Sequence, residues 1–266
     1  MKYAIIGLGN MAQSMVASLL EGKALAQEEL ILYSRTPESI EKVRSVYPAT
    51  HVAPTLQEAV SQADIICVCV YTHFVIETIE KFYKENFKKP IIYISPSIKL
   101  TCLEERFEGI QATMLIPTVA SLGGEGVTLF SSNQATTQST KECIKTLFGK
   151  IGMVKEYYGT QMFLATVLTS CMPAFVAKII ESFETVGVEL EILSASDIQE
   201  MVAATFSGTA NLILTSDKTP RDIQEMVATK GGITEKGLLA MSEPVAKMVE
   251  DIYRATLQKL GVSDAK

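Results

Sequence analysis

The chain begins with Lys2-Tyr3-Ala4-Ile5-Ile6-Gly7-Leu8-Gly9-Asn10-Met11-Ala12, an apolar strand pattern that leads into a Gly-x-Gly-x-x-Ala turn and an amphipathic helix pattern. Gly7 permits a tight turn, Gly9 lets the backbone approach a pyrophosphate, and the small Ala12 lets the helix pack on a sheet. The helix N-terminus then points at the phosphates. The stretch predicts a dinucleotide site contacted by Gly7, Leu8, Gly9, Asn10, Met11 and Ala12.

The first half of the chain alternates short apolar runs with helical patterns. Strands are expected near residues 3–6, 30–34, 64–70, 90–94 and 112–117, with helices beginning near Met11, Pro37, Thr55, His73 and Leu100. Strand-like runs at 126–131 and 154–157, separated by a helix near 137–148, extend the series. Such alternation predicts a parallel sheet that is covered by helices on both faces.

After about Gly159 the pattern is helical only. We therefore predict an α/β fold with two domains. Residues 1–157 form an N-terminal Rossmann-type, doubly wound dinucleotide-binding domain, and residues 158–266 form an all-α C-terminal domain.

The composition is apolar for a water-soluble chain, with a hydrophobic content of 47% and a mean hydropathy of +0.22. Residues 157–177 carry no formal charge and are nominally long enough to cross a bilayer. Gly159, Gln161, several hydroxyl side chains and Pro173 make the stretch too polar for a convincing span. We expect no membrane insertion, and instead a helix that is buried between two subunits.

The formal net charge of −6 arises from residues 156–266, because the charges of residues 1–155 balance. No basic face is expected, which argues against nucleic acid as a partner. The cysteines are odd in number and no signal-like segment opens the chain, so we predict that the protein is located in the reducing cytoplasm. Cys67 and Cys69 lie in a continuous apolar run, which indicates a buried strand and no metal site.

The second expected strand ends in Ser34-Arg35-Thr36. NAD-binding versions of this fold carry an acidic residue here, whereas a guanidinium between two hydroxyls suits a 2′-phosphate. Ser34, Arg35 and Thr36 therefore predict NADPH as cofactor, with NADH as the alternative. The competing interpretation is that Arg35 is a solvated loop residue and Thr36 caps the helix that starts at Pro37.

Further motifs, together with the glycine turn and Ser34-Arg35-Thr36, resemble the pyrroline-5-carboxylate reductase family along the whole chain. They are Ile116-Pro117, Gly124-Glu125-Gly126-Val127-Thr128, Pro173-Ala174-Phe175, Gly231-Gly232-Ile233-Thr234 and Gly237-Leu238. The resemblance implies an NAD(P)H-dependent reductase that converts the cyclic imine 1-pyrroline-5-carboxylate to L-proline by hydride transfer. It also implies that residues 158–266 form a dimerisation and substrate domain, so that the protein is a homodimer or an assembly of dimers.

The resemblance also assigns roles to residues. Thr234 is the expected catalytic contact to the imine nitrogen, and Thr229 with the amides around Gly231, Gly232 and Ile233 holds the carboxylate. Taken without the family, this loop suits a small anion or a helix cap. The other candidates are Lys230 and Cys171 on the substrate side, and Val70, Tyr71, Thr72 and Thr118 on the cofactor side.

Departures from the family's usual motifs cluster at the expected active site. Thr118 stands where an Asn is usual, Met172 replaces a Gly, and Lys230 replaces a Pro. These changes resemble the ComER-type late-competence paralogues. A specialised imine reductase and a non-catalytic nucleotide-binding regulator therefore stay open as alternatives. A hydroxyacid dehydrogenase with Lys178 as general acid is disfavoured, because the accompanying Asn is absent.

Overall fold

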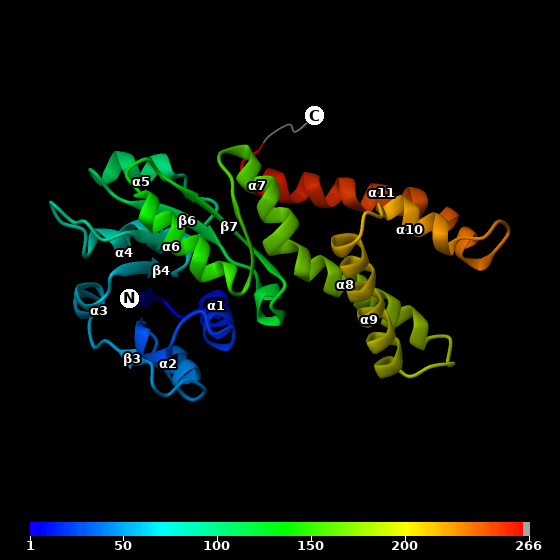
Figure 1. The fold of residues 1–266 in the computed structure, drawn as a ribbon, viewed down its shortest axis with the longest axis horizontal. Coiled ribbons are helices and arrows are strands. Elements are labelled where there is room, and N and C mark those ends of the chain that lie inside the picture. Colours follow the sequence, from blue (N-terminus) through cyan, green and yellow to red (C-terminus); the bar gives the residue numbers. More distant parts are fainter. Residues whose placement is uncertain (263–266) are drawn as a thin grey trace. The chain divides into compact units, whose positions relative to one another are not determined.

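The computed structural model describes residues 1–262 (Figure 1). Their backbone separates into two compact units. The first contains residues 1–173 and the last described residues, 260–262, and the second contains residues 174–259.

The first unit is built on an eight-stranded sheet with the order β3-β2-β1-β4-β5-β6-β7-β8. The strands are β1 (Tyr3–Ile6), β2 (Leu30–Tyr33), β3 (His51–Val52), β4 (Ile65–Val68), β5 (Ile91–Tyr93), β6 (Ala112–Ile116), β7 (Gly126–Ser132) and β8 (Gly152–Glu156). The predicted α/β fold is confirmed. The order reverses at β1, which pairs with β2 on one side and β4 on the other, and this is the place where such sheets bind ligands.

The expectation of a wholly parallel sheet is wrong at one pair, because β7 runs antiparallel to β6. Residues 117–125 between them form only a short 3₁₀ segment, η3 (Val119–Gly123). A parallel return needs a crossover of a dozen or more residues, usually a helix. The helix α6 (Gln138–Gly149) does provide such a crossover one step later, and β8 is accordingly parallel to β7.

Helices cover both faces of the sheet, as predicted. On one face α1 (Asn10–Glu21), α2 (Pro37–Arg44) and α6 share a core with Tyr3 and Ile5 of β1. On the other face the core contains Ala4 and Ile6 of the same strand. The helices there are α3 (Leu56–Gln62), α4 (Val75–Glu80), α5 (Leu100–Arg106) and α7 (Thr160–Thr166). Adjacent side chains of β1 thus enter opposite cores, as a strand pleat requires.

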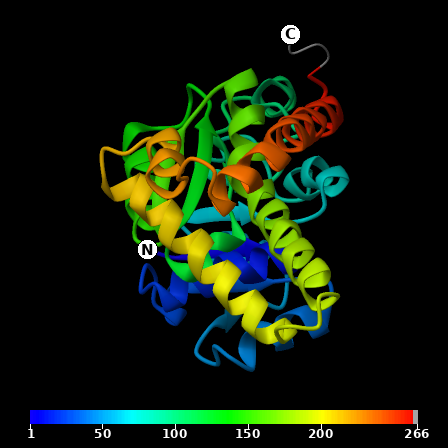
Figure 2. The same ribbon diagram turned by 90° about the vertical axis from the view of Figure 1, so that its right-hand side faces the viewer.

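The second unit consists of helices in the residues that the structure describes (Figure 2). They are α8 (Met172–Val188), whose first two residues belong to the first unit, α9 (Ala195–Thr215), α10 (Pro220–Val227) and α11 (Ile233–Lys259). Large apolar side chains stay exposed on them, including Phe183, Leu214 and Leu239 at 55%, 71% and 73%. This unit therefore leaves much of its apolar surface uncovered within a single chain.

The helical stretch Thr160–Val188 has the length and composition of a membrane-crossing helix, with a mean hydropathy of 1.8. Composition alone is weak support for a span. Its first part, α7, and the π-helical turn Val167–Cys171 pack on the sheet through Met162, Ala165 and Val167. The compact units divide at Pro173, after this packed part, whereas β8 ends at Glu156. The division into domains at residue 157 stays a prediction.

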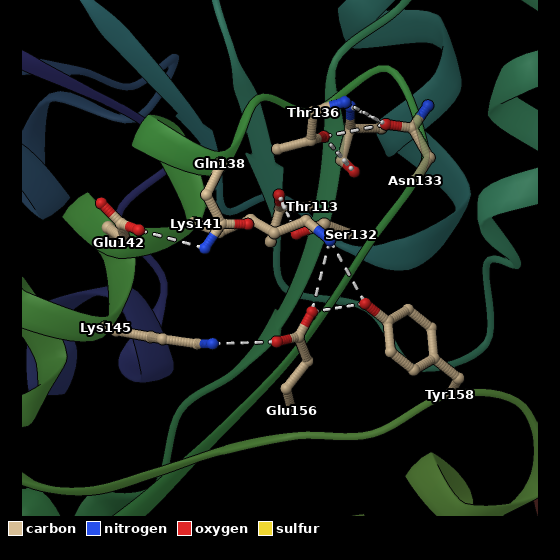
Figure 3. A network of polar contacts seen from close by, with 11 residues as sticks. Thr113, Ser132, Asn133, Thr136, Gln138, Lys141, Glu142, Lys145, Glu156 and Tyr158 are labelled. Atoms are coloured by element: carbon tan, nitrogen blue, oxygen red, sulfur yellow. Dashed lines mark hydrogen bonds and ion pairs between the residues drawn. The ribbon is translucent and has the colours of Figure 1, made fainter.

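A buried polar network ties β6 to β7 (Figure 3). The Asn133 side-chain oxygen accepts hydrogen bonds from the Ala112 amide at 3.1 Å and the Thr136 hydroxyl at 2.8 Å. Its nitrogen donates to the Ile110 carbonyl at 2.7 Å. Across the strand pair, the Thr113 and Ser132 hydroxyls lie 2.8 Å apart. The network therefore satisfies buried polar groups at the start of β6 and the end of β7.

Replacing Asn133 with alanine leaves the Ala112 amide and the Ile110 carbonyl without these partners in a buried site. We expect Asn133→Ala to lower the free energy of unfolding by about 2–4 kcal/mol, measured by urea denaturation. The neighbouring exposed variant Gln134→Ala is the control and should change it by less than about 0.5 kcal/mol. Equal effects of the two variants would contradict the role assigned to the network.

Candidate functional site

The glycine turn lies at the carboxyl end of β1. Gly7 has a φ of +92°, and its amide donates to the Tyr33 carbonyl at the end of β2. A Cβ on Gly7 would lie 2.8 Å from the Cys69 carbonyl oxygen and from Val70. Only glycine meets both conditions, because this φ disfavours other residues and the close approach to the segment after β4 leaves no space.

Gly9, the residue before α1, differs from Gly7 in its backbone conformation and in the space around it. Its φ is −73°, and a Cβ built there has no heavy atom within 4 Å. No side chain caps α1 and no acidic residue lies in its first turn. The first amides of the helix, including those of Asn10 and Met11, are therefore available as donors beside open space. The residues present thus fit a pyrophosphate at this end of α1.

Arg35 lies at the end of β2 with an exposed side chain. Its guanidinium carbon stands 4.9 Å from the centroid of the Phe74 ring, in a cation–π contact. The Ser34 hydroxyl accepts a hydrogen bond from the Thr36 amide at 3.2 Å. Thr36 does occupy the residue before α2, but its side chain makes no capping hydrogen bond. Its hydroxyl is therefore available for a ligand.

The segment after β4 carries Val70, Tyr71 and Thr72. The Thr72 hydroxyl lies 2.8 Å from the hydroxyl of Ser95, a buried residue that follows β5. Tyr71 is 79% exposed. Our sequence reasoning missed Ser95 and Phe74, although both lie just beyond strands whose carboxyl ends face this edge of the sheet.

Thr118 is buried at the end of β6, and its hydroxyl is used inside the protein. It donates to the Thr169 carbonyl at 3.2 Å and accepts from the Ala120 amide. The Ser170 hydroxyl donates to the Pro117 carbonyl at 3.0 Å. These bonds fix the π-helical turn against the end of β6. Cys171 ends that turn, and burial raises the pKa of its thiol.

The predicted substrate loop belongs to the second unit. Gly231 has a φ of +75°, and its amide donates to the Glu235 carboxylate at 2.7 Å. The Gly232 amide donates to the Thr229 carbonyl at 2.8 Å. Ile233, which begins α11, is 90% exposed. The Gly231 amide of this loop thus already donates to a carboxylate of the protein, that of Glu235, which sequence reasoning missed.

The predicted site residues therefore form two groups. The first group lies at the carboxyl edge of the sheet and comprises Gly7 to Ala12, Ser34 to Thr36, Val70 to Thr72 and Thr118. Cys171 belongs to the same unit, on the π-helical turn. Thr229, Lys230, Gly231, Gly232, Ile233 and Thr234 form one turn and the start of α11 in the second unit. Residues 1–262 contain no group of three or more His, Cys, Asp or Glu side chains that could hold a metal.

Two family models match separate parts of the chain. A model described as pyrroline-5-carboxylate reductase dimerisation matches residues 160–261, and one described as NADP oxidoreductase, coenzyme F420-dependent, matches residues 2–98. The curated "Pyrroline-5-carboxylate reductase 3" of Bacillus subtilis is 28% identical and aligns over 96% of this chain and 94% of its own length. The C-terminal part of the chain thus matches the pyrroline-5-carboxylate reductase dimerisation model, and the chain is similar to a curated reductase over nearly its whole length.

Other similarities extend over nearly the whole chain. "ComE operon protein 4" of Bacillus subtilis is 26% identical, with 97% of this chain and 95% of that protein covered. A crystal structure of Plasmodium falciparum pyrroline carboxylate reductase, with NADP bound, matches with a TM-score of 0.88 at 23% identity. It covers 97% of this chain and 96% of its own, and shows that the reductase fold is shared.

Within this reductase-family fold, Gly7 and Gly9 predict different responses to alanine. Gly7→Ala meets the Cys69 carbonyl and a positive φ, so we expect a loss of about 1–3 kcal/mol in the free energy of unfolding. Gly9→Ala meets open space at an ordinary φ, and should cost less than about 1 kcal/mol. If a pyrophosphate binds against Gly9, this variant will still raise the dissociation constant for NADPH by about tenfold or more.

Urea denaturation and fluorescence titration with NADPH measure the two quantities separately. A Gly9→Ala protein that is stable and binds NADPH as well as the parent would contradict the placement of the phosphates beside α1.

Proposed function

We propose that the chain catalyses the NADPH-dependent reduction of 1-pyrroline-5-carboxylate, a cyclic imine, to L-proline. The observation that carries the proposal is the similarity to a curated pyrroline-5-carboxylate reductase over 96% of the chain. The geometry at the carboxyl edge of the sheet supports it, because it combines open helix amides with an Arg35 guanidinium at the ribose end.

The cofactor residues would divide the dinucleotide between them. The α1 amides would bind the pyrophosphate, and Arg35 with the Ser34 and Thr36 hydroxyls would bind the 2′-phosphate that distinguishes NADPH from NADH. Val70, Tyr71 and Thr72 would line the path towards the nicotinamide. When bound, NADPH supplies the hydride that reduces the imine carbon.

The loop before α11 would hold the substrate. Its amides and Thr229 would bind the carboxylate, and the Thr234 hydroxyl would contact the imine nitrogen. Lys230 adds a positive charge next to these amides. The protein thereby orients the imine and stabilises its charge, which is how binding groups lower such a barrier.

The remaining features fit a two-domain dimer. We propose that residues 158–266 form the dimerisation and substrate domain, supported by the dimerisation model that matches residues 160–261. A homodimer, alone or within an assembly of dimers, would cover the exposed apolar side chains of the second unit. A cytoplasmic location would agree with the free cysteines at 67, 69, 102, 143 and 171.

A second candidate function is a paralogue that acts on another imine, or an NADP-binding regulator without catalysis. The relative "ComE operon protein 4" supports it, and so does the use of the Thr118 hydroxyl inside the protein. The Thr118 hydroxyl donates its single proton to the Thr169 carbonyl, so no donor is left for a nicotinamide amide, whereas the family's usual Asn offers both a donor and an acceptor.

The direct test is oxidation of NADPH by the purified protein in the presence of 1-pyrroline-5-carboxylate, followed by the absorbance of reduced nicotinamide. We expect turnover, and we expect Thr234→Val to lower kcat/KM about 100-fold because the imine nitrogen loses a donor. Thr215→Val is the matched control, since the Thr215 hydroxyl is exposed and bonds only the Asn211 carbonyl of its own helix. NADPH binding without turnover would favour the second candidate.

A further inference from the structure

We infer that Phe74 is a positioning residue that orients the Arg35 guanidinium for the 2′-phosphate and so sets the preference for NADPH. The inference rests on the proposed nucleotide site and is independent of the substrate. Arg35 follows β2 and Phe74 ends η2 (Thr72–Phe74), which follows β4. Because β2 and β4 flank β1, the two residues come from either side of the strand that leads into the glycine turn.

The contact leaves the hydrogen-bonding capacity of Arg35 free. A guanidinium carries five N–H donors, and a cation–π contact does not satisfy them as a carboxylate or carbonyl acceptor would. A carboxylate partner would instead occupy those donors and neutralise the charge. The nearby Glu77 is bonded to Lys81, which holds the pKa of the Glu77 carboxyl below its usual range, with smaller contributions from Arg35 and His73. Arg35 is thus held in place while its donors stay available.

The turn that carries Phe74 is anchored by several contacts. The Phe74 amide donates to the Tyr71 carbonyl at 2.8 Å, and Val75, the next residue, is buried in the core. The His73 ring packs on the Phe74 ring, with centroids 4.0 Å apart. The bond between Thr72 and Ser95 anchors the same turn to the segment after β5. The long and otherwise exposed Arg35 side chain therefore contacts a ring on an anchored turn, so less side-chain entropy is lost when it binds a phosphate.

A different role for Phe74 would be a direct contact with the adenine or ribose. The two roles differ in their consequences. A direct contact would serve NADPH and NADH alike and would persist when Arg35 is absent. Positioning of Arg35 by Phe74 would strengthen the binding of NADPH alone, and this effect would be lost when Arg35 is replaced.

The experiment is a double-mutant cycle of Phe74→Leu and Arg35→Ala, with dissociation constants for NADPH and NADH from titrations of nicotinamide fluorescence. We expect Phe74→Leu to weaken NADPH binding about two- to tenfold, the range for ordering one long side chain on binding. NADH binding should stay within about 1.5-fold, and Phe74→Leu should have no further effect in the Arg35→Ala background. Phe74→Trp, which keeps the ring face, should restore NADPH binding.

Phe87→Leu is the matched control, because Phe87 is an aromatic residue of the same unit that packs on Phe82 and Tyr83. Equal losses for NADPH and NADH, additive effects in the cycle, or an Arg35→Ala protein that binds NADPH normally would each overturn the inference. These affinities need no turnover. A protein that shows the expected cycle but does not reduce 1-pyrroline-5-carboxylate would therefore contradict the proposed reaction and leave the role of Phe74 standing.

Discussion

The close approach of Gly7 to the backbone after β4 is the constraint on which the proposed nucleotide site at the carboxyl edge of the sheet depends. With a φ of +92° and no room for a Cβ beside the Cys69 carbonyl, the chain turns sharply at the end of β1. That turn starts α1 at Gly9 with open space before its first amides. β1, which leads into this turn, pairs with β2 on one side and β4 on the other, and Arg35 and Phe74, which follow those two strands, are in contact.

The two units divide the work in different physical ways. The sheet unit buries its strands under helices on both faces, so its carboxyl edge is a rigid frame. The helical unit keeps large apolar side chains exposed along α8, α9 and α11. Exposure of such a surface to water is unfavourable. Because residues 160–261 match a dimerisation model, we expect a partner subunit to cover it. The proposed nucleotide site thus lies within one unit, whereas the loop proposed to hold the substrate lies in the other.

The sequence predicted those parts of the structure that local chemistry determines. Alternating apolar runs and helical periods identified the sheet and its covering helices, and the spacing of Gly7, Gly9 and Ala12 identified the nucleotide turn. The antiparallel direction of β7 was not predicted, because it depends on the length of the connection from β6 and not on a residue pattern. Contacts between side chains distant in sequence were not predicted either: Phe74 with Arg35, Ser95 with Thr72, and Thr118 with Thr169. The bond from the Gly231 amide to the Glu235 carboxylate is a further contact that the sequence pattern did not predict.

The central claim is that a pyridine nucleotide binds along the carboxyl edge of the sheet, and hydrogen–deuterium exchange with and without NADPH tests it most directly. The account predicts slower exchange in the segments that carry Gly9 to Ala12, Ser34 to Thr36 and Val70 to Phe74, because bound phosphate and ribose groups accept from or shield these amides. The exchange rates of the amides in α5, one of the helices that cover the sheet, should be unchanged. Protection that appears elsewhere while these segments exchange as before would contradict the account.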